Sequence, residues 1–188
     1  TISISAAGFN RPLGLSYETT NKFLYVADSN AHRVKVYDLT AISDNENAVN
    51  ALGQLDDSNN PVYSQYGPNN TVFNVDGKGF RFSSPMMSDY GGIQVDTVNH
   101  RLFVSDNNRV LIFNLNTDNT LVDRTADFVL GQSDLTSQVL GPTGAGKMYS
   151  PAGLAYDSTG SRLFVADQGY NRVMVFNLAD GITNGENA

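Results

Sequence analysis

Three aspartates, each followed closely by an arginine, are the residues whose type and recurrence most invite a chemical role. The pairs are Asp28 with Arg33, Asp106 with Arg109, and Asp167 with Arg172. Carboxylates bind metals and act as general bases. Each aspartate, however, ends an apolar run just before a turn, where backbone N–H groups need acceptors. Because catalysis requires one site and this pair occurs three times, we predict that the pairs are structural.

The two histidines of the chain, His32 and His100, fall in different kinds of predicted turn. Two such residues do not supply the three-histidine set of a catalytic zinc site. The acidic stretch 44–47 leaves calcium as an alternative, although the Asp-x-Asp-x-Asp-Gly spacing of a calcium loop is absent from the sequence. We therefore predict no metal site and no other cofactor, with calcium as the open alternative.

Residues 141–147 have the glycine spacing and the lysine of a phosphate-binding loop. Met148 then stands where such a loop carries the Ser or Thr that binds magnesium. A strand is expected to follow, whereas a phosphate-binding loop opens a helix. We therefore predict that this segment is a flexible loop.

The elements that must position the aspartates recur three times along the chain. Each copy has a glycine and an apolar strand, a second apolar strand that ends in the aspartate, and a third that begins at the arginine. The glycines are Gly14, Gly92 and Gly153, each 14 residues before its aspartate. A fourth short element, Leu-Gly-Gln, follows at residues 52–54 and 130–132. Four short β-rich segments per copy predict four-stranded antiparallel sheets repeated in series, the pattern of a β-propeller.

Residues 26–34 and 165–173 resemble the NHL repeat, in which an apolar strand and Ala-Asp lead through a short loop with Asn to Arg-Val. The second copy departs from this pattern, because Ser105 replaces the alanine and the loop is two residues shorter. The resemblance covers the cores of the repeats, somewhat more than half of the chain. It implies an all-β fold, a β-propeller of four-stranded antiparallel NHL-like blades, with three blades in this chain.

We expect residues 1–188 to form one propeller segment, with blades at about residues 12–54, 90–132 and 151–188. The last blade lacks its outer strand. Residues 1–5, Thr-Ile-Ser-Ile-Ser, have the pattern of an extra strand, which we expect to complete the third blade of a neighbouring chain. Two such chains would close a six-bladed ring with two-fold symmetry. The alternative, a segment of a longer array of blades, stays equally open.

The composition narrows the classes of partner. The formal net charge is −7, which repels phosphate backbones and argues against nucleic-acid binding. The chain has no cysteine, which excludes disulfides and thiolate chemistry. No apolar run approaches the ~20 residues that span a bilayer. From the resemblance, the acidity and the Asn-, Ser- and Thr-rich loops, we expect an extracellular, periplasmic or cell-surface location.

Function is expected on the two long connections between blades, at about residues 55–90 and 133–150. In propellers such connections emerge on the same face as the loops between the second and third strands. The ligand-binding residues predicted on this face are His32, Tyr63, Tyr66, Gln168 and Tyr170. An equally open interpretation is that the aromatic residues only cover the edges of blades.

The resemblance implies a non-catalytic binding or assembly module for a protein or carbohydrate partner. The extra strand at residues 1–5 adds the expectation of self-assembly into a homo-oligomer by strand exchange. The alternative is an enzyme, because similar six-bladed propellers include lactonases and a metal-dependent lyase, whose acidic or histidine groups converge on the central channel. The polar inner-strand residues that would have to serve are Ser16, Glu18, Gln94, Asp96 and Asp157. Because they are few, we favour binding over catalysis.

Overall fold

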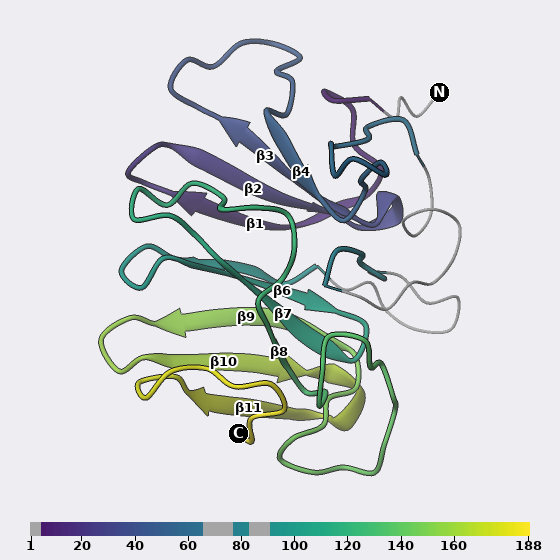
Figure 1. Ribbon diagram of the computed structural model, residues 1–188, viewed down its shortest axis with the longest axis vertical. Coiled ribbons are helices and arrows are strands. Elements are labelled where there is room, and N and C mark those ends of the chain that lie inside the picture. Colours follow the sequence, from purple (N-terminus) through teal and green to yellow (C-terminus); the bar gives the residue numbers. More distant parts are fainter. Residues whose placement is uncertain (1–4, 66–76, 83–90) are drawn as a thin grey trace.

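The computed structural model describes residues 5–65, 77–82 and 91–188, and within them every regular element longer than one turn is a β-strand. The strands form three antiparallel sheets that follow one another in chain order (Figure 1). This confirms the predicted all-β class with antiparallel sheets, and the described residues form no closed ring. Within this part of the chain, no helix has the length and hydropathy needed to cross a membrane.

Each sheet is built from neighbouring strands in sequence order. Sheet one contains β1 (Pro12–Glu18), β2 (Phe23–Asp28), β3 (Arg33–Asp38) and β4 (Asn50–Leu52). Sheet two contains β5 (Ile93–Asp96), β6 (Arg101–Asp106), β7 (Arg109–Asn114) and β8 (Phe128–Leu130). Sheet three contains β9 (Pro151–Asp157), β10 (Arg162–Asp167) and β11 (Arg172–Asn177). Among the described residues, sheet three therefore has three strands where the other two sheets have four.

The loop between the second and third strands brings each aspartate opposite its arginine. In sheets one and three this loop is a single 3-10 turn, η1 (Ser29–Ala31) or η3 (Gln168–Tyr170), closed by a residue in the left-handed region. In sheet two it is the shorter turn 107–108. The register pairs Asp28 with Arg33, Asp106 with Arg109, and Asp167 with Arg172. All three pairs thus lie at the same end of their hairpins.

The sheets pack face to face through two apolar clusters. We call the side of a sheet that faces the preceding sheet its front, and the side that faces the following sheet its back. The back of sheet one, with Val34 and Val36, packs on the front of sheet two, with Leu111 and Phe113. The back of sheet two, with Val110, Ile112 and Phe103, packs on the front of sheet three, with Met174 and Phe176. Burial of such side chains, at about 1.5–3 kcal/mol each, holds the sheets together.

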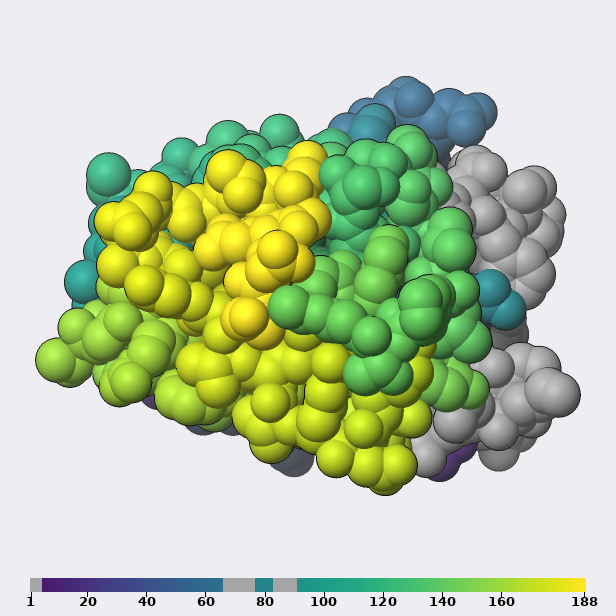
Figure 2. Space-filling model, turned by 90° about the horizontal axis from the view of Figure 1, so that it is seen from below, coloured from purple at the N-terminus to yellow at the C-terminus, as the bar shows by residue number. Residues whose placement is uncertain are grey.

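The two outer surfaces of this stack differ in how they are covered. The front of sheet one is covered in part by residues 5–9, because the buried Lys35 donates hydrogen bonds to the carbonyls of Ser5 (2.8 Å), Ala6 (3.0 Å) and Gly8. The predicted strand at residues 1–5 lies outside the described residues, apart from Ser5. At the other end, Figure 2 shows residues of β10 and β11 at the surface.

Candidate functional site

The aspartate and arginine of sheet one form a fully buried ion pair that fastens two connections to the end of the sheet. Arg33 Nε donates to Asp28 Oδ2 at 2.9 Å, and both side chains are inaccessible to solvent. The other carboxylate oxygen of Asp28 accepts the N–H of Asn10 at 2.6 Å. The rest of the guanidinium donates to the carbonyls of Tyr63 (2.7 Å) and Gly8 (3.3 Å). We call this arrangement of carboxylate, guanidinium and held backbone the Asp–Arg clip.

Sheet two repeats the clip with the same atoms. Arg109 Nε donates to Asp106 Oδ2 at 2.7 Å, again with both side chains fully buried. The N–H of Arg81 donates to Asp106 Oδ1. The guanidinium of Arg109 also donates to the carbonyls of Leu135 (2.7 Å) and Gly79 (3.3 Å). The guanidinium therefore holds the connection that enters sheet two and the connection that leaves it.

The clip of sheet three has the same core and is more open to solvent. Arg172 Nε donates to Asp167 Oδ2 at 2.7 Å, and the N–H of Tyr149 donates to Asp167 Oδ1 at 2.7 Å. The guanidinium also donates to the carbonyls of Gly144 (2.9 Å) and Lys147. In all three sheets the carboxylate binds an arginine side chain and a backbone N–H.

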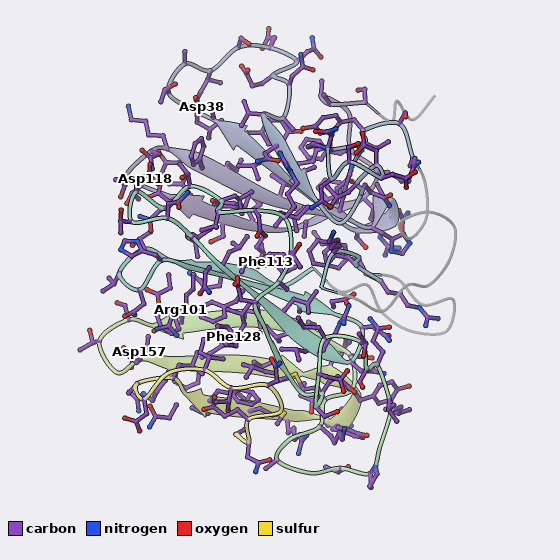
Figure 3. All side chains as sticks on the ribbon, in the orientation of Figure 1. Asp38, Arg101, Phe113, Asp118, Phe128 and Asp157 are labelled. Atoms are coloured by element: carbon purple, nitrogen blue, oxygen red, sulfur yellow. The ribbon has the colours of Figure 1, made fainter. Side chains whose placement is uncertain are left out.

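The acidic groups at the other end of the hairpins are also occupied. Glu18 accepts the N–H groups of Thr20 and Asn21, both at 2.6 Å. Asp96 and Asp157 accept the corresponding N–H groups of the turns that follow β5 and β9. Figure 3 labels Asp157 at the edge opposite the clips. These carboxylates cap turns and are spread over three sheets.

The hollow between the innermost strands has an apolar lining. It has a volume of about 350 Å³. The lining residues are Leu13, Gly14, Leu15, Gly91, Gly92, Ile93, Ala152, Gly153 and Leu154. None of these side chains carries an acid or a base. Ser16 and Asp96, predicted as candidates for an enzyme site, are not in the lining. Ser16 Oγ accepts the N–H of Val95 within the junction at 2.9 Å. Gln94 donates to the carbonyl of its neighbour Val95.

His32, which we predicted as a ligand contact, lies at the junction between sheets one and two. Its side chain is buried, and Nδ1 accepts the N–H of Phe82 at 3.1 Å. Burial lowers the pKa of the His32 imidazole, opposed by the charge of Asp106. His32 therefore supports the junction between sheets one and two. His100 lies half-buried in a turn, with Nδ1 2.7 Å from Asn119 Oδ1. Across residues 5–65, 77–82 and 91–188, no three His, Cys, Asp or Glu side chains are grouped to hold a metal ion.

Tyr63 covers the front of sheet one. It packs against the cluster of Val26, Tyr37 and Ala48, and its hydroxyl donates to the Ala48 carbonyl at 3.3 Å. Burial raises the pKa of Tyr63. This agrees with the interpretation that the aromatic residues of the connection cover a sheet. Tyr66, the other aromatic residue predicted there, lies outside the described residues.

Gln168 and Tyr170 lie in η3, at the opposite end of the stack from Tyr63. Gln168 is exposed, whereas Tyr170 is partly buried. The Tyr170 ring makes an edge-to-face contact with Tyr149, with centroids 5.6 Å apart, and its hydroxyl donates to the Gly141 carbonyl. The predicted ligand-binding residues that the structure describes belong to segments on one side of the molecule. We call it the loop side, the side of η1, η3 and residues 133–150 (Figure 1). The predicted residues do not form one patch, because sheet two separates them.

Two exposed aliphatic residues on the loop side were missed by sequence reasoning. Val139 and Leu140 are 61% and 52% exposed. Their backbone is held in place, because Gln132 accepts the Val139 N–H at 3.0 Å and donates to the Val139 carbonyl at 3.1 Å. The preceding Gln138 donates to Asp106 Oδ2 at 3.1 Å. The recurring Leu-Gly-Gln element was the available signal, since its glutamine is the residue that fixes this loop.

The buried Lys35 makes stability depend on pH above neutrality. Burial lowers the pKa of Lys35 from 10.5 to about 8, with a smaller contribution from Arg33. Between these values the unfolded chain holds a proton that the folded chain has released, so folding becomes more favourable as the pH rises. We expect the free energy of unfolding of wild type to increase relative to that of Lys35→Met as the pH rises from about 8 to 10. Urea unfolding of both proteins across that range measures it, and a constant difference contradicts it.

Above pH 10 the buried tyrosines act in the opposite direction. Burial raises the pKa of Tyr25 and Tyr37 above their usual value of 10.0. The unfolded chain then loses protons that the folded chain keeps, so their contribution to stability is lost as the pH rises. The contribution of Tyr25 is common to wild type and Lys35→Met. Because Lys35 Nζ donates to the Tyr37 hydroxyl at 3.3 Å, the two proteins are compared below pH 10, where Tyr37 keeps its proton in the folded chain.

Comparison with known proteins gives one family match. The NHL repeat model matches residues 9–37, which span β1, β2 and η1 and most of β3, with the clip of sheet one. This match supports the resemblance to NHL repeats found in the sequence. An NHL repeat indicates a module of the β-propeller type that takes part in protein interactions. No curated protein matches the chain.

Proposed function

We propose, from the NHL repeat at residues 9–37 and the geometry of the loop side, that this chain is a non-catalytic binding module of the propeller type. Its partner is a protein that contacts the loop side, with Val139 and Leu140 as the anchor. The observation that carries the proposal is the combination of two exposed aliphatic side chains with a backbone fixed by Gln132. Exposed apolar groups on a preorganised loop bind at low entropic cost.

The chemistry of the surface favours a protein over a carbohydrate partner. Aliphatic side chains fill apolar pockets on proteins, whereas sugars are bound by exposed aromatic faces and polar groups. The tyrosines that we predicted for such a role, Tyr63 and Tyr170, have their hydroxyls bonded within the chain. The repeated carboxylates are engaged in clips and turn caps, which supports binding rather than catalysis.

Replacing both anchor side chains tests the proposal. Val139→Asp with Leu140→Asp should abolish capture of a partner without loss of fold, because both side chains project into solvent. Immobilised wild-type chain is exposed to extracellular and membrane extracts of the producing cells, and the retained proteins are identified by mass spectrometry. We expect proteins whose retention falls at least about tenfold with the double variant. The matched control is Val122→Asp, at a residue of similar exposure in the connection between β7 and β8.

Two outcomes contradict the proposal. Equal retention by the double variant and by wild type means that these residues are not the anchor. Binding of the wild type to a glycan array, lost in the double variant, assigns the loop side to a carbohydrate instead.

A further inference from the structure

We infer that the back of sheet three in one chain docks on the front of sheet one in a second copy of the chain. The inference rests on the junctions between sheets and is independent of the loop-side proposal. It concerns the two surfaces at the ends of the stack, each of which has a buried counterpart inside the same molecule.

The back of sheet three exposes side chains at positions that are buried in both other sheets. Val173 and Val175 of β11 are 64% and 40% exposed. The residues at the same positions of β3 and β7 are at most 3% exposed; they are Val34, Val36, Val110 and Ile112. At both internal junctions these positions contact the front of the next sheet. The back of sheet three therefore has the composition of a junction surface without a sheet against it in the described residues.

The glycine that begins the innermost strand supplies independent evidence. A Cβ on Gly14 would lie 1.6 Å from the Gly91 carbonyl oxygen, and a Cβ on Gly92 would lie 2.2 Å from that of Ala152. Both glycines therefore let the next sheet approach closely. Gly153 occupies the same position in sheet three, yet a Cβ there would meet only Ala166 Cβ, at 3.7 Å. Glycine at this position fits the close approach of a further sheet.

The front of sheet one shows the complementary exposure. Phe9, Phe80 and Met148 are equivalent, because each immediately precedes the residue whose N–H binds the clip aspartate. Phe80 and Met148 are 2% and 0% exposed within the junctions, whereas Phe9 is 37% exposed. A hollow of about 270 Å³ lies beside Phe9. Its lining residues are Ala7, Phe9, Leu24, Tyr37, Leu39, Asn45 and Glu46.

The turn at residues 43–46, next to this hollow, matches the turn at residues 183–186, which is hydrogen-bonded to the preceding sheet. After β11, Asn184 Oδ1 accepts the N–H of Val129 in β8 at 2.9 Å, and the Gly185 N–H donates to the Val129 carbonyl at 3.2 Å. After β3, residues 43–46 repeat this turn: Asn45 has a φ of 60°, where Gly185 has 74°. In both turns a glutamate two residues after Asp44 or Asn184 accepts an N–H. The front of sheet one thus has the contact groups used towards a preceding sheet.

A second copy is the occupant that these surfaces specify. One chain contains both halves of the contact, and equivalent surfaces of neighbouring sheets pack against each other at both internal junctions. A head-to-tail contact of this kind closes a ring when its rotation permits. Two chains of three sheets would give six, which lies within the range of four to eight blades found in propellers.

The solution mass of the chain and of a Gly153→Val variant tests the inference. Sedimentation equilibrium should give twice the mass of one chain for wild type and the mass of one chain for Gly153→Val. We expect the dissociation constant of the dimer to be at least about tenfold higher for Gly153→Val than for wild type. Valine is accommodated in the isolated chain because the site is open and β-strands favour it. Gly144→Val, at another open glycine outside the strands, is the matched control and should remain associated. Wild type with the mass of one chain at all concentrations overturns the inference.

Cross-linking tests the orientation and uses the absence of native cysteine. Ala7→Cys lies at the hollow of sheet one, and Val175→Cys lies on the back of sheet three. A short bismaleimide should link the two variants when they are mixed and should link neither variant to itself. Links that form equally in the unmixed samples indicate a symmetric contact and overturn the head-to-tail arrangement. Val173→Glu, a substitution at an exposed side chain, should suppress the mixed link while the thermal unfolding midpoint of the isolated chain is unchanged.

Discussion

Replacing Arg109 with methionine is expected to lower the free energy of unfolding by about 3–5 kcal/mol. Both Arg109 and Asp106 are fully buried, so the substitution leaves an unpaired carboxylate without access to water. The carbonyls of Leu135 and Gly79 lose their donor at the same time. Urea unfolding followed by circular dichroism measures the change.

The exposed pair of Arg162 and Asp157 is the control for this prediction. Its ion pair has the same 2.7 Å separation, but the arginine side chain is 53% exposed. Arg162→Met should therefore cost no more than about 1 kcal/mol. If the two variants lose the same stability, burial is not what makes the clip important. The double variant Asp106→Asn with Arg109→Met should lose less than the sum of the single changes, because the partners act together.

The glycine at the first junction is expected to be nearly as sensitive. In Gly14→Ala the new Cβ would lie 1.6 Å from the Gly91 carbonyl oxygen, which is backbone and moves only with β1 or the start of sheet two. We expect a loss of about 3 kcal/mol, because overpacking a junction forces backbone shifts. Thermal and urea unfolding should both report it.

Gly144→Ala provides the contrast, since a Cβ there meets nothing closer than 4.0 Å. Its stability should equal that of wild type or exceed it by a few tenths of a kcal/mol, because alanine restricts the unfolded chain. A stability of Gly14→Ala close to that of Gly144→Ala would show that sheets one and two separate at little cost. The close approach at the first junction would then be unimportant.

The parts of the fold that repeat were accessible from the sequence. Asp28 and Arg33 could be paired because the same two residue types return near the same distance in each copy, at the end of an apolar strand. A recurring local pattern fixes the hairpin register, and the register places the carboxylate opposite the guanidinium. The backbone groups that complete each clip come from the connections. Gly8-Phe9 recurs as Gly79-Phe80, but the residue types alone do not show which carbonyls and N–H groups of a connection face the clip.

The predicted ligand contacts were less accessible because their exposure depends on distant segments. From the sequence, His32 is a loop residue. In the structure its imidazole is buried and accepts the backbone N–H of Phe82, which lies 50 residues later. Tyr63 is likewise covered by its own contacts with sheet one. Val139 and Leu140 were overlooked for the opposite reason: aliphatic residues in a loop normally turn inward. Here the Gln132 side chain hydrogen-bonds to both backbone groups of Val139, and the Val139 side chain is exposed.

The three guanidinium groups also determine where the connections may vary. Arg109 grips the carbonyl of Leu135 just after sheet two, and Arg172 grips that of Lys147 just before sheet three. The segment between these two points begins and ends at positions fixed by the framework, whatever its own length. Lengthening such a segment adds closure entropy only slowly. Foreign peptides grafted into this segment would therefore be held at both ends by the sheets, so that the chain would serve as a scaffold for displayed loops.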